Sequence, residues 1–347
     1  MLTDPLHSPI GNPTAWEPLA HNTLNQATGG IWRVTGPGGT AILKHATSTG
    51  EGAGHWPAST DPHHWNYWQR EYLAYNTGAV AEYCDRADLT APAMLAAGER
   101  PDGSVELWLE ALDAPSPAHW SLDQLAYTAR QLGIAQASLR EEPEQPWGSR
   151  RFLRTYAGRR DFGQIPWDHP LIAAHWPENL RDGLRRIWER RTDLFDLAEA
   201  LPQTLCHLDL WPMNLTHRTH TPALLDWAFT GTGAIGEDLA NLIPDTFFDG
   251  LAPIDELEAT ESALIDAYLT GLAEAGYRGE DTTRKAIAAT GAAKYAWLAP
   301  AMLTGLTAGK PAASANYDTE SDDAAVLRRR APIFTMLVRW ASAALDS

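Results

Sequence analysis

The sequence predicts an α+β protein of two lobes, a small antiparallel-sheet lobe followed by a larger and mainly helical lobe. Three observations support this prediction. The 347 residues exceed one typical domain. Strand-like stretches dominate from Leu19 to Leu112, and amphipathic helical stretches dominate from Leu122 onward. We therefore predict lobes at residues 1–112 and 113–347, with the boundary close to Leu112.

The composition indicates a globular chain without a cysteine framework. Apolar residues make up 44% and charged residues 20%, which is enough to build a core. The net charge of −17 argues against general affinity for nucleic acid or anionic membranes. It is compatible with a cationic substrate, although acidic surfaces also serve solubility alone. With only Cys84 and Cys206, neither a disulfide framework nor a cysteine zinc site is expected.

No targeting or membrane segment is predicted. The first 13 residues contain neither a basic region nor an apolar core, so they do not read as a signal peptide. The apolar stretch after Gly291 is interrupted by Lys294 and Pro300, and no run approaches the length of a membrane span. We therefore expect a cytoplasmic protein with no membrane partner.

The first lobe opens with two glycine-containing stretches. In the first, Asn25–Val34, we predict that Thr28, Gly29 and Gly30 form a turn between strands. Backbone amides of such a turn can approach phosphate oxygens closely, because glycine has no side chain. An ordinary hairpin turn is an equal alternative. The second stretch, Gly38–Ala46, reads as a turn and an alternating strand that ends in Lys44.

Further elements complete the predicted order. Aromatic residues at helical spacing predict a helix at Trp65–Asn76, which includes Glu71. Strands are expected at Leu89–Ala97 and Val105–Leu112. The second lobe is predicted to contain helices at Leu122–Leu139, Leu180–Leu201, Glu256–Tyr277, Thr282–Gly305 and Ala324–Leu345.

One stretch of the second lobe carries the chemistry. His207, Asp209 and Asn214 follow the pattern H-x-D-x-x-x-x-N, and Asp226 follows in LLDW. Phosphoryl transfer needs such a set, because one carboxylate orients the attacking hydroxyl and accepts its proton, while an amide oxygen and a second carboxylate hold magnesium. Asp209 is thus the candidate base, and Asn214 and Asp226 are the candidate metal ligands.

The local pattern around these residues predicts a hairpin. Residues 209–214 read as a loop leading into a short strand, residues 216–222 as a turn, and residues 223–225 as a second strand that ends at Asp226. Such a hairpin would bring Asn214 and Asp226 together. Taken singly, Asp209 and Asp226 could each be turn or capping residues. Their combined spacing favours a phosphotransferase site.

These motifs resemble those of the aminoglycoside phosphotransferase-like family, the small-molecule branch of the protein-kinase fold. The family writes its catalytic loop roughly as H-G-D-x-x-x-x-N and its metal aspartate as an apolar pair followed by D-W or D-F. The later GEDLANL, with Asp238, is similar to the family's D-L-A stretch. Two departures are Leu208 in place of the usual Gly and Trp211 in place of the frequent His. The resemblance implies that His207 supports the loop structurally.

The resemblance also assigns nucleotide-binding roles. It implies that Lys44 holds the α- and β-phosphates of the nucleotide and pairs with Glu71. A strand-end surface charge is the alternative for Lys44, and a solvated helix charge is the alternative for Glu71. The adenine would be bound by backbone groups of the strand that enters the hinge, near Glu110 to Leu112. In the family, helices after the metal aspartate commonly build the acceptor pocket. Trp211, Asp245 and Asp249 are therefore candidate acceptor contacts, and both aspartates are equally compatible with capping.

A second kinase-like tripeptide, DFG at Asp161–Gly163, does not fit this assignment. In the protein-kinase pattern the metal aspartate follows the H-x-D loop, whereas this tripeptide precedes it. We predict that it is a turn.

The implied activity is transfer of the γ-phosphoryl group of ATP or GTP, with Mg²⁺, to a hydroxyl of a small molecule. We expect an antibiotic or related natural product of the aminoglycoside, nucleoside, peptide or macrolide type. The alternative is a metabolic kinase for a sugar, choline or homoserine. A nucleotide-binding pseudokinase is disfavoured, because Lys44, Asp209, Asn214 and Asp226 are all present. The sequence does not choose between ATP and GTP, or between a monomer and a homodimer.

Overall fold

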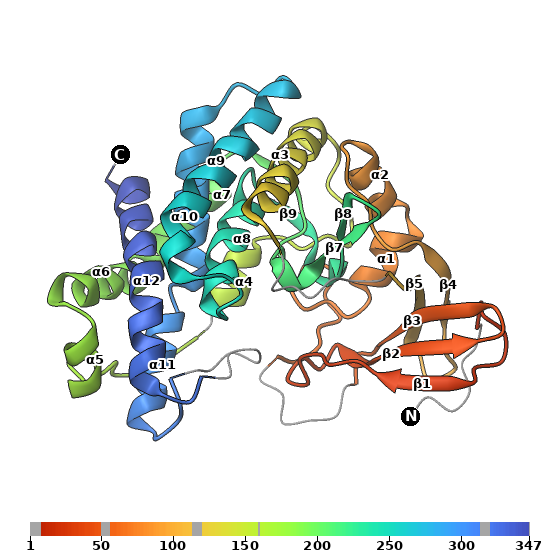
Figure 1. The fold of residues 1–347 in the computed structure, drawn as a ribbon, viewed down its shortest axis with the longest axis horizontal. Helices are drawn as coiled ribbons and strands as arrows, with labels where there is room; N and C mark the ends of the chain where they lie inside the picture. Colours follow the sequence, from red (N-terminus) through yellow and green to blue (C-terminus); the bar gives the residue numbers. More distant parts are fainter. Residues whose placement is uncertain (1–7, 50–55, 113–119, 159, 313–319, 347) are drawn as a thin grey trace. The chain divides into compact units, whose positions relative to one another are not determined.

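The computed structural model describes residues 8–49, 56–112, 120–158, 160–312 and 320–346 (Figure 1). The chain divides into two compact units. Unit 1 comprises residues 1–116, 143–150 and 213–231, and unit 2 comprises residues 117–142, 151–212 and 232–347. This division differs from the predicted single boundary near Leu112, because the segment that carries Asn214 and Asp226 belongs to unit 1.

Unit 1 contains the predicted antiparallel sheet. Its five strands have the order β1-β2-β3-β5-β4, and each neighbouring pair is antiparallel. The strands alternate between buried and more exposed residues in β2 and β3, which is the pattern of a sheet with one face on a core. They are β1 (Ala15–Pro18), β2 (Thr28–Gly36), β3 (Gly39–Ala46), β4 (Met94–Glu99) and β5 (Val105–Glu110).

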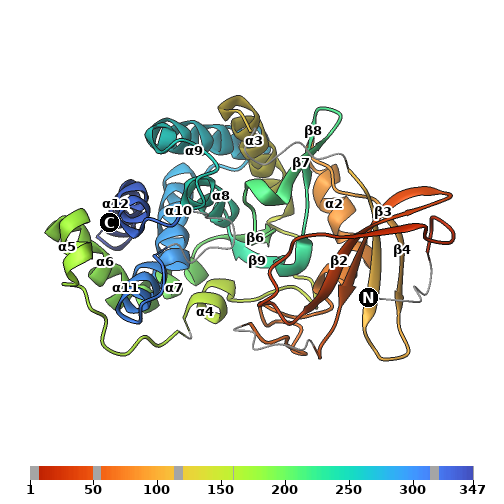
Figure 2. The same cartoon turned by 60° about the horizontal axis from the view of Figure 1, so that its bottom comes forward.

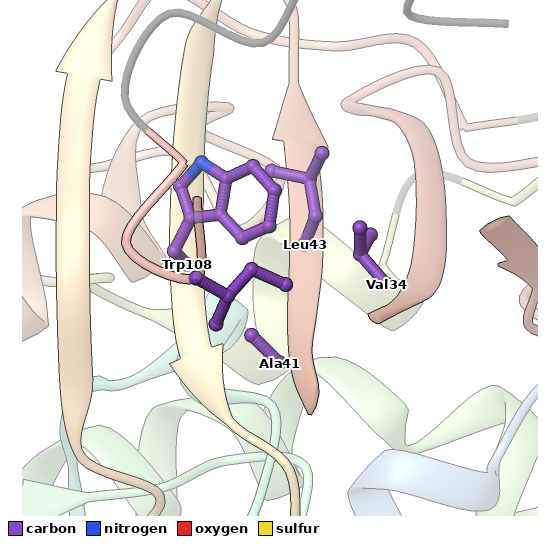
Figure 3. Packing of buried hydrophobic residues seen from close by; sticks show 5 residues of the cluster. Val34, Ala41, Leu43 and Trp108 are labelled. Atoms are coloured by element: carbon purple, nitrogen blue, oxygen red, sulfur yellow. The ribbon is translucent and has the colours of Figure 1, made fainter. Parts of the chain in front are cut away.

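The buried face of this sheet is organised around Trp108. Val34 of β2, Ala41 and Leu43 of β3, and Trp108 of β5 form one apolar cluster with Ile10 (Figure 3). Because successive side chains of a strand alternate between faces, Lys44 points away from Leu43. Lys44 lies opposite Leu107 and is followed by two further strand residues, so it is not the strand end that the sequence predicts.

The predicted turn at Thr28–Gly30 is wrong. These residues begin β2, and an irregularity in the pairing of β2 with β3 lies between Thr28 and Gly30. A Cβ atom on Gly29 would collide with the His45 ring, and one on Gly30 with the Trp32 ring. The two glycines therefore make room for neighbouring side chains instead of forming a turn. The segment between β1 and β2, residues 19–27, contains no glycine.

The helix predicted at Trp65–Asn76 begins later, at Arg70. The observed helices are α1 (Arg70–Asn76) and α2 (Ala79–Asp85). Arg70 is fully buried and donates hydrogen bonds to the backbone carbonyls of Pro62, His64, Trp65, Trp147 and Ala228, at 2.6–3.1 Å. Three of these carbonyls belong to the segment that precedes α1. This segment forms turns that hold these carbonyls at the guanidinium group, and the helix begins only at Arg70.

We expect Arg70→Lys to destabilise the protein. A lysine carries three donors and lacks the planar fork, so several of the five carbonyls would remain buried without a partner. The free energy of unfolding should fall by about 3 to 5 kcal/mol. Urea denaturation followed by tryptophan fluorescence measures this. Arg86→Lys, at an exposed i,i+4 pair with Glu82, is the control and should change stability by less than about 0.5 kcal/mol.

Unit 2 is mainly helical, and its first helix has the predicted bounds. α3 (Leu122–Leu139) begins with a capping box between Ser121 and Gln124. It lies beside α9 (Leu257–Glu274) in both views (Figures 1 and 2). Close approach of the two helices depends on glycine. A Cβ atom on Gly133 would collide with the carbonyl of Tyr268, and one on Gly271 with the carbonyl of Arg130.

Other helices of unit 2 surround a buried core. The helix predicted at Leu180–Leu201 is two helices that break at Arg190. A two-stranded sheet pairs β6 (Gln203–Cys206) with β9 (Gly231–Ala234). The remaining helices are α4 (Phe152–Ala157), α5 (Pro170–His175), α6 (Glu178–Glu189), α7 (Arg191–Ala200), α8 (Glu237–Phe248), α10 (Glu280–Tyr295), α11 (Leu298–Thr307) and α12 (Asp323–Leu345).

The structure also describes the DFG tripeptide and the length of the helices. The DFG tripeptide is a turn, in which Asp161 Oδ1 accepts a hydrogen bond from the Gly163 amide at 2.9 Å and Gly163 has φ +57°. None of the helices in the described ranges is both long and apolar enough to cross a membrane.

Candidate active site

Unit 1 brings three of the predicted charged residues into contact. Lys44 Nζ lies 2.7 and 2.9 Å from the two carboxylate oxygens of Glu71, so the predicted ion pair is present. The same ammonium group lies 3.0 Å from Asp226 Oδ1. The Lys44 and Glu71 side chains are 16% and 12% exposed, whereas Asp226 is 39% exposed. Glu71 is therefore enclosed, and Asp226 retains access to a ligand.

The electrostatics of this triad leave one negative charge in excess. Burial opposes the Lys44 ammonium, but the charges of Asp226 and Glu71 outweigh it and raise the pKa of Lys44. Burial raises the pKa of Glu71, and the nearby Asp226 adds to this effect. Lys44 is thus a fixed cation that two carboxylates share. A divalent cation at Asp226 would relieve the competition between the two carboxylates.

A hairpin delivers Asn214 and Asp226 to one end of a strand pair. β7 (Leu215–Arg218) pairs with β8 (Thr221–Leu224), with Leu215 opposite Leu224. The Leu225 amide donates to the Asn214 carbonyl at 2.9 Å. This is the arrangement that the sequence predicts, with strands longer and a turn shorter than expected. Because the hairpin is formed by neighbouring segments, its strand and turn residues carried a local signal.

The backbone at Asp226 is unusual. It has φ +62°, which is the left-handed region, and it precedes the short 3₁₀ helix η3 (Trp227–Phe229). Asp and Asn adopt this region more readily than other non-glycine residues. The conformation turns the chain sharply after β8, and the Asp226 carboxylate then reaches Lys44.

These donors fit a magnesium ion held together with nucleotide phosphates. Carboxylate and amide oxygens are hard ligands, and magnesium usually keeps one or two protein carboxylates besides phosphates and water. In the described ranges, no three His, Cys, Asp or Glu side chains gather in a metal-binding cluster. The described His, Cys, Asp and Glu side chains therefore do not form a complete metal site by themselves. Coordination shared with nucleotide phosphates would need only Asp226 and Asn214 from the protein.

The structure narrows the predicted adenine contact. The Glu110 amide donates to the Ala93 carbonyl at 2.9 Å, so it is used inside the sheet. The Glu110 carboxylate accepts from the Ala93 amide at 3.1 Å and pairs with Arg218. The amide and the carboxylate of Glu110 are therefore both used within unit 1. Leu112 lies beyond the end of β5, and the residues that follow it, 113–119, lie outside the described residues. The backbone of Leu112 remains the predicted contact.

Unit 2 positions the loop that carries Asp209. Asp238, fully buried, accepts hydrogen bonds from the amides of His207 and Leu208 at 2.8 and 2.7 Å and from Gln136 Nε2 at 2.7 Å. His207 is also fully buried, and its Nδ1 accepts from the Asp209 amide at 3.3 Å. Asp238 therefore holds the backbone of the loop, and His207 binds the amide of Asp209. Both are structural contacts of the kind predicted for these residues.

Leu208 adopts the conformation that explains why glycine is usual at this position. It has φ +67°, which costs a leucine roughly 1–2 kcal/mol. Its side chain is 1% exposed, and burial of a leucine contributes about 1.5–3 kcal/mol. Its amide is held by Asp238, and its carbonyl accepts from Lys294 Nζ at 3.2 Å. Packing and hydrogen bonds therefore offset the strain, and the loop keeps its path without glycine.

Two contacts to this loop, and one contact to Asp238 that holds it, were not predicted from the sequence. Lys294 of α10 is buried and binds the Leu208 carbonyl, and Asn241 of α8 donates to the Leu210 carbonyl. Gln136 of α3 binds Asp238. Asn241 follows Asp238 by three residues, so helical spacing places both on one face and is a signal that could have identified it. A lysine within the apolar stretch after Gly291 is the corresponding signal for Lys294.

Two buried carboxylates, those of Glu237 and Asp238, make the stability of the protein depend on pH. Burial raises the pKa of Glu237 to about 8 and that of Asp238 to about 6. The folded state therefore binds protons more tightly than the unfolded chain, so stability is greatest below the unfolded pKa values and is lost as pH rises toward these folded values. We expect the unfolding free energy to fall between about pH 4, near the ordinary carboxyl pKa values, and about pH 8. Glu237→Gln, which still offers an oxygen to the Ala234 amide, should reduce the fall by on the order of 1 kcal/mol in urea titrations.

Among the three predicted acceptor contacts, Asp245 has several polar neighbours in the structure. Asp245 lies on α8, where burial raises its pKa while the Lys294 charge and hydrogen bonds with Tyr295 and Asn241 lower it. Asp249 is the residue directly after α8 and is half-buried. Trp211 is half-buried in the segment after Leu210. Asp245 is thus within the polar surroundings of the Asp209 loop.

Comparison with known proteins identifies the family of the chain. Residues 31–280 match the model of the Phosphotransferase enzyme family. The chain belongs to this family. No curated protein matches its sequence. Among solved structures, this phosphotransferase is similar to an amicoumacin kinase, with 12% identity, TM-score 0.55, and 95% of this chain and 90% of that chain covered.

A second similar structure is the aminoglycoside phosphotransferase APH(4)-Ia, as a ternary complex with AMP-PNP and hygromycin B of a thermostable mutant. It shows 13% identity, TM-score 0.50, and 96% coverage of both chains. At these identities the likeness establishes the fold alone. The protein-kinase-like α+β fold predicted from the sequence is confirmed.

Proposed function

We propose that this phosphotransferase transfers the γ-phosphoryl group of ATP or GTP to a hydroxyl of a small molecule, an antibiotic or related natural product, in the cytoplasm. The observation that carries the proposal is the set of contacts at Lys44. This lysine pairs with enclosed Glu71 and with accessible Asp226, and the carbonyl of Asn214 accepts a hydrogen bond from the amide of Leu225, the residue before Asp226. Each group has the charge and chemistry that a magnesium-nucleotide requires.

The chemistry divides between the two sets of residues. Lys44 would neutralise phosphate oxygens, and Asp226 and Asn214 would hold Mg²⁺, which offsets the charge of the β- and γ-phosphates when bound. Asp209 would orient the acceptor hydroxyl and take its proton. The acceptor oxygen then forms a bond to the γ-phosphorus, while the bond to the bridging oxygen breaks and the nucleoside diphosphate leaves. The protein contributes position and charge, without a covalent intermediate.

The acceptor class is supported by similar structures. One is described as a complex of an amicoumacin kinase with AMP-PNP, Ca²⁺ and its ligand, and another holds AMP-PNP and hygromycin B. Both structures hold AMP-PNP together with a second small molecule, Ami in one and hygromycin B in the other. Their fold similarity favours an antibiotic acceptor for this chain as well, and metabolic hydroxyl compounds are the alternative that the experiment must separate.

The test is release of nucleoside diphosphate with Mg²⁺ and ATP or GTP against a panel of acceptors. The panel contains aminoglycosides, a nucleoside antibiotic, a peptide antibiotic and a macrolide, together with sugars, choline and homoserine. Release that depends on an antibiotic and is lost in Asp209→Ala supports the proposal. Release with only a sugar, choline or homoserine replaces it with a metabolic kinase. Nucleotide binding without release on any acceptor contradicts transfer to the small molecules of the panel.

A further inference from the structure

Unit 2 contains a stacked cluster of Arg160, Tyr156 and Trp297 that the mechanism above does not use. The guanidinium carbon of Arg160 lies 3.5 Å from the ring centroid of Trp297 and 5.5 Å from that of Tyr156. The two rings meet edge to face, with centroids 6.5 Å apart. Tyr156 is stacked in turn on buried Phe152, at 5.2 Å and 8°. The aromatic rings thus hold a half-buried guanidinium in a fixed orientation.

This guanidinium lacks a counter-charge in the described part of the chain. Arg160 forms no hydrogen bond or ion pair there, although acidic residues outnumber basic residues by 44 to 27. Burial lowers its pKa. The indole Nε1 of Trp297 is buried and also has no hydrogen-bond partner among the described residues. The guanidinium of half-buried Arg160 can therefore accept a charged partner from solution, because no charge of the described residues neutralises it.

The cluster lies beside the loop of the proposed base. The ammonium group of Lys294 lies 3.2 Å from the Leu208 carbonyl and 5.9 Å from the ring centroid of Tyr156, so one side chain contacts both. Asp209 directly follows Leu208. The charges of Asp209 and Asp245 both act on the Tyr156 hydroxyl and raise its pKa, with burial as the largest cause. A molecule resting on these rings would therefore be close to Asp209.

We propose that Arg160, held by Tyr156 and Trp297, binds a carboxylate of the acceptor, so that this enzyme selects hydroxyl compounds that carry a carboxylate group. The inference rests on the proposed function and specifies its acceptor. A planar guanidinium presents paired donors that match two carboxylate oxygens, and stacking fixes the fork before the acceptor arrives.

The experiment compares acceptors in pairs that differ only in this group. The probes are serine-, threonine- and tyrosine-containing peptides with free or amidated C-termini, and hydroxy acids with their methyl esters. Nucleoside diphosphate release gives kcat and KM for each. The variants are Arg160→Gln and Arg160→Lys. Arg191→Gln is the matched control, because Arg191 also stacks on a tryptophan, Trp188, at 3.8 Å. Thermal melting verifies that all variants fold.

We expect free acids to exceed their neutral partners in kcat/KM by about tenfold to a hundredfold. Arg160→Gln should abolish this preference by raising the acceptor KM, Arg160→Lys should retain part of it, and Arg191→Gln should retain all of it. The nucleotide KM should not change. The inference is overturned if wild-type enzyme treats both members of each pair alike, if no free acid stimulates release, or if Arg160→Gln raises the nucleotide KM instead.

The two levels of failure differ. If neither these probes nor the antibiotic and metabolite panel stimulates release, the proposed function fails and the acceptor assignment fails with it. If a polycationic or neutral acceptor is phosphorylated, and Asp209→Ala abolishes this, the proposed function stands while the carboxylate assignment is wrong.

Discussion

Replacing Asp209 with asparagine should reduce kcat by about 10²- to 10⁴-fold, which is the usual contribution of a general base. Asparagine keeps the shape of the side chain but cannot accept the hydroxyl proton. The loop should persist, because it is held by backbone groups of the neighbouring His207, Leu208 and Leu210, none of which uses the Asp209 carboxylate. The nucleotide affinity should therefore change little. Steady-state nucleoside diphosphate release gives kcat, and calorimetric titration with a non-hydrolysable nucleotide gives the affinity.

Asp161→Asn is the matched control for this experiment. Asp161 belongs to a DFG tripeptide and is exposed in a turn of the same unit, so its charge should not matter for transfer. Asparagine can also accept the hydrogen bond from the Gly163 amide. Near-normal kcat in Asp209→Asn would refute the assignment of the base. Loss of transfer in Asp161→Asn would return the DFG tripeptide to consideration as a functional motif.

The hairpin and α3 could be predicted because their signals are local. The alternation around Leu215 and Leu224 and the capping pair Ser121 and Gln124 each lie within a few residues of the structure that they define. The Lys44–Glu71 pair is not local, since 27 residues separate its members. The resemblance to the family predicts this pair, and in the structure Lys44 and Glu71 are in contact.

The missed features depend on contacts between distant segments. Arg70 looked like an ordinary helix residue, but its five carbonyl partners extend from Pro62 to Ala228. In the structure the segment before Arg70 forms turns that carry three of these carbonyls, although its aromatic residues have helical spacing. Gly29 and Gly30 looked like a turn, because sequence shows that a side chain is absent without showing which neighbour requires its absence. Here the neighbours are His45 and Trp32. The periodicity of a sequence indicates the structure of one helix or strand at a time. The contacts of Arg70 and the space beside Gly29 and Gly30 depend on two or more segments.

Replacing Asp226 with asparagine should weaken the binding of the magnesium-nucleotide complex to the enzyme. Asparagine tolerates the left-handed backbone at this position, so the variant removes a charge without adding strain. Without that carboxylate the site has one fewer negative charge for Mg²⁺, and Lys44 pairs with Glu71 alone. We expect the Mg²⁺ concentration for half-maximal activity to rise by about tenfold to a hundredfold. We also expect kcat to fall by about 10²-fold or more.

The measurement is transfer as a function of Mg²⁺ at saturating nucleotide, with Asp102→Asn as control. Asp102 is an exposed turn residue of unit 1, and its hydrogen bonds with Ser104 can be kept by asparagine. A metal ligand predicts that high Mg²⁺ restores part of the activity of Asp226→Asn, because mass action compensates for a weaker site. A purely structural role predicts lower thermal stability and no rescue by the metal. An unchanged Mg²⁺ dependence would remove Asp226 from the metal site and leave it as the second partner of Lys44.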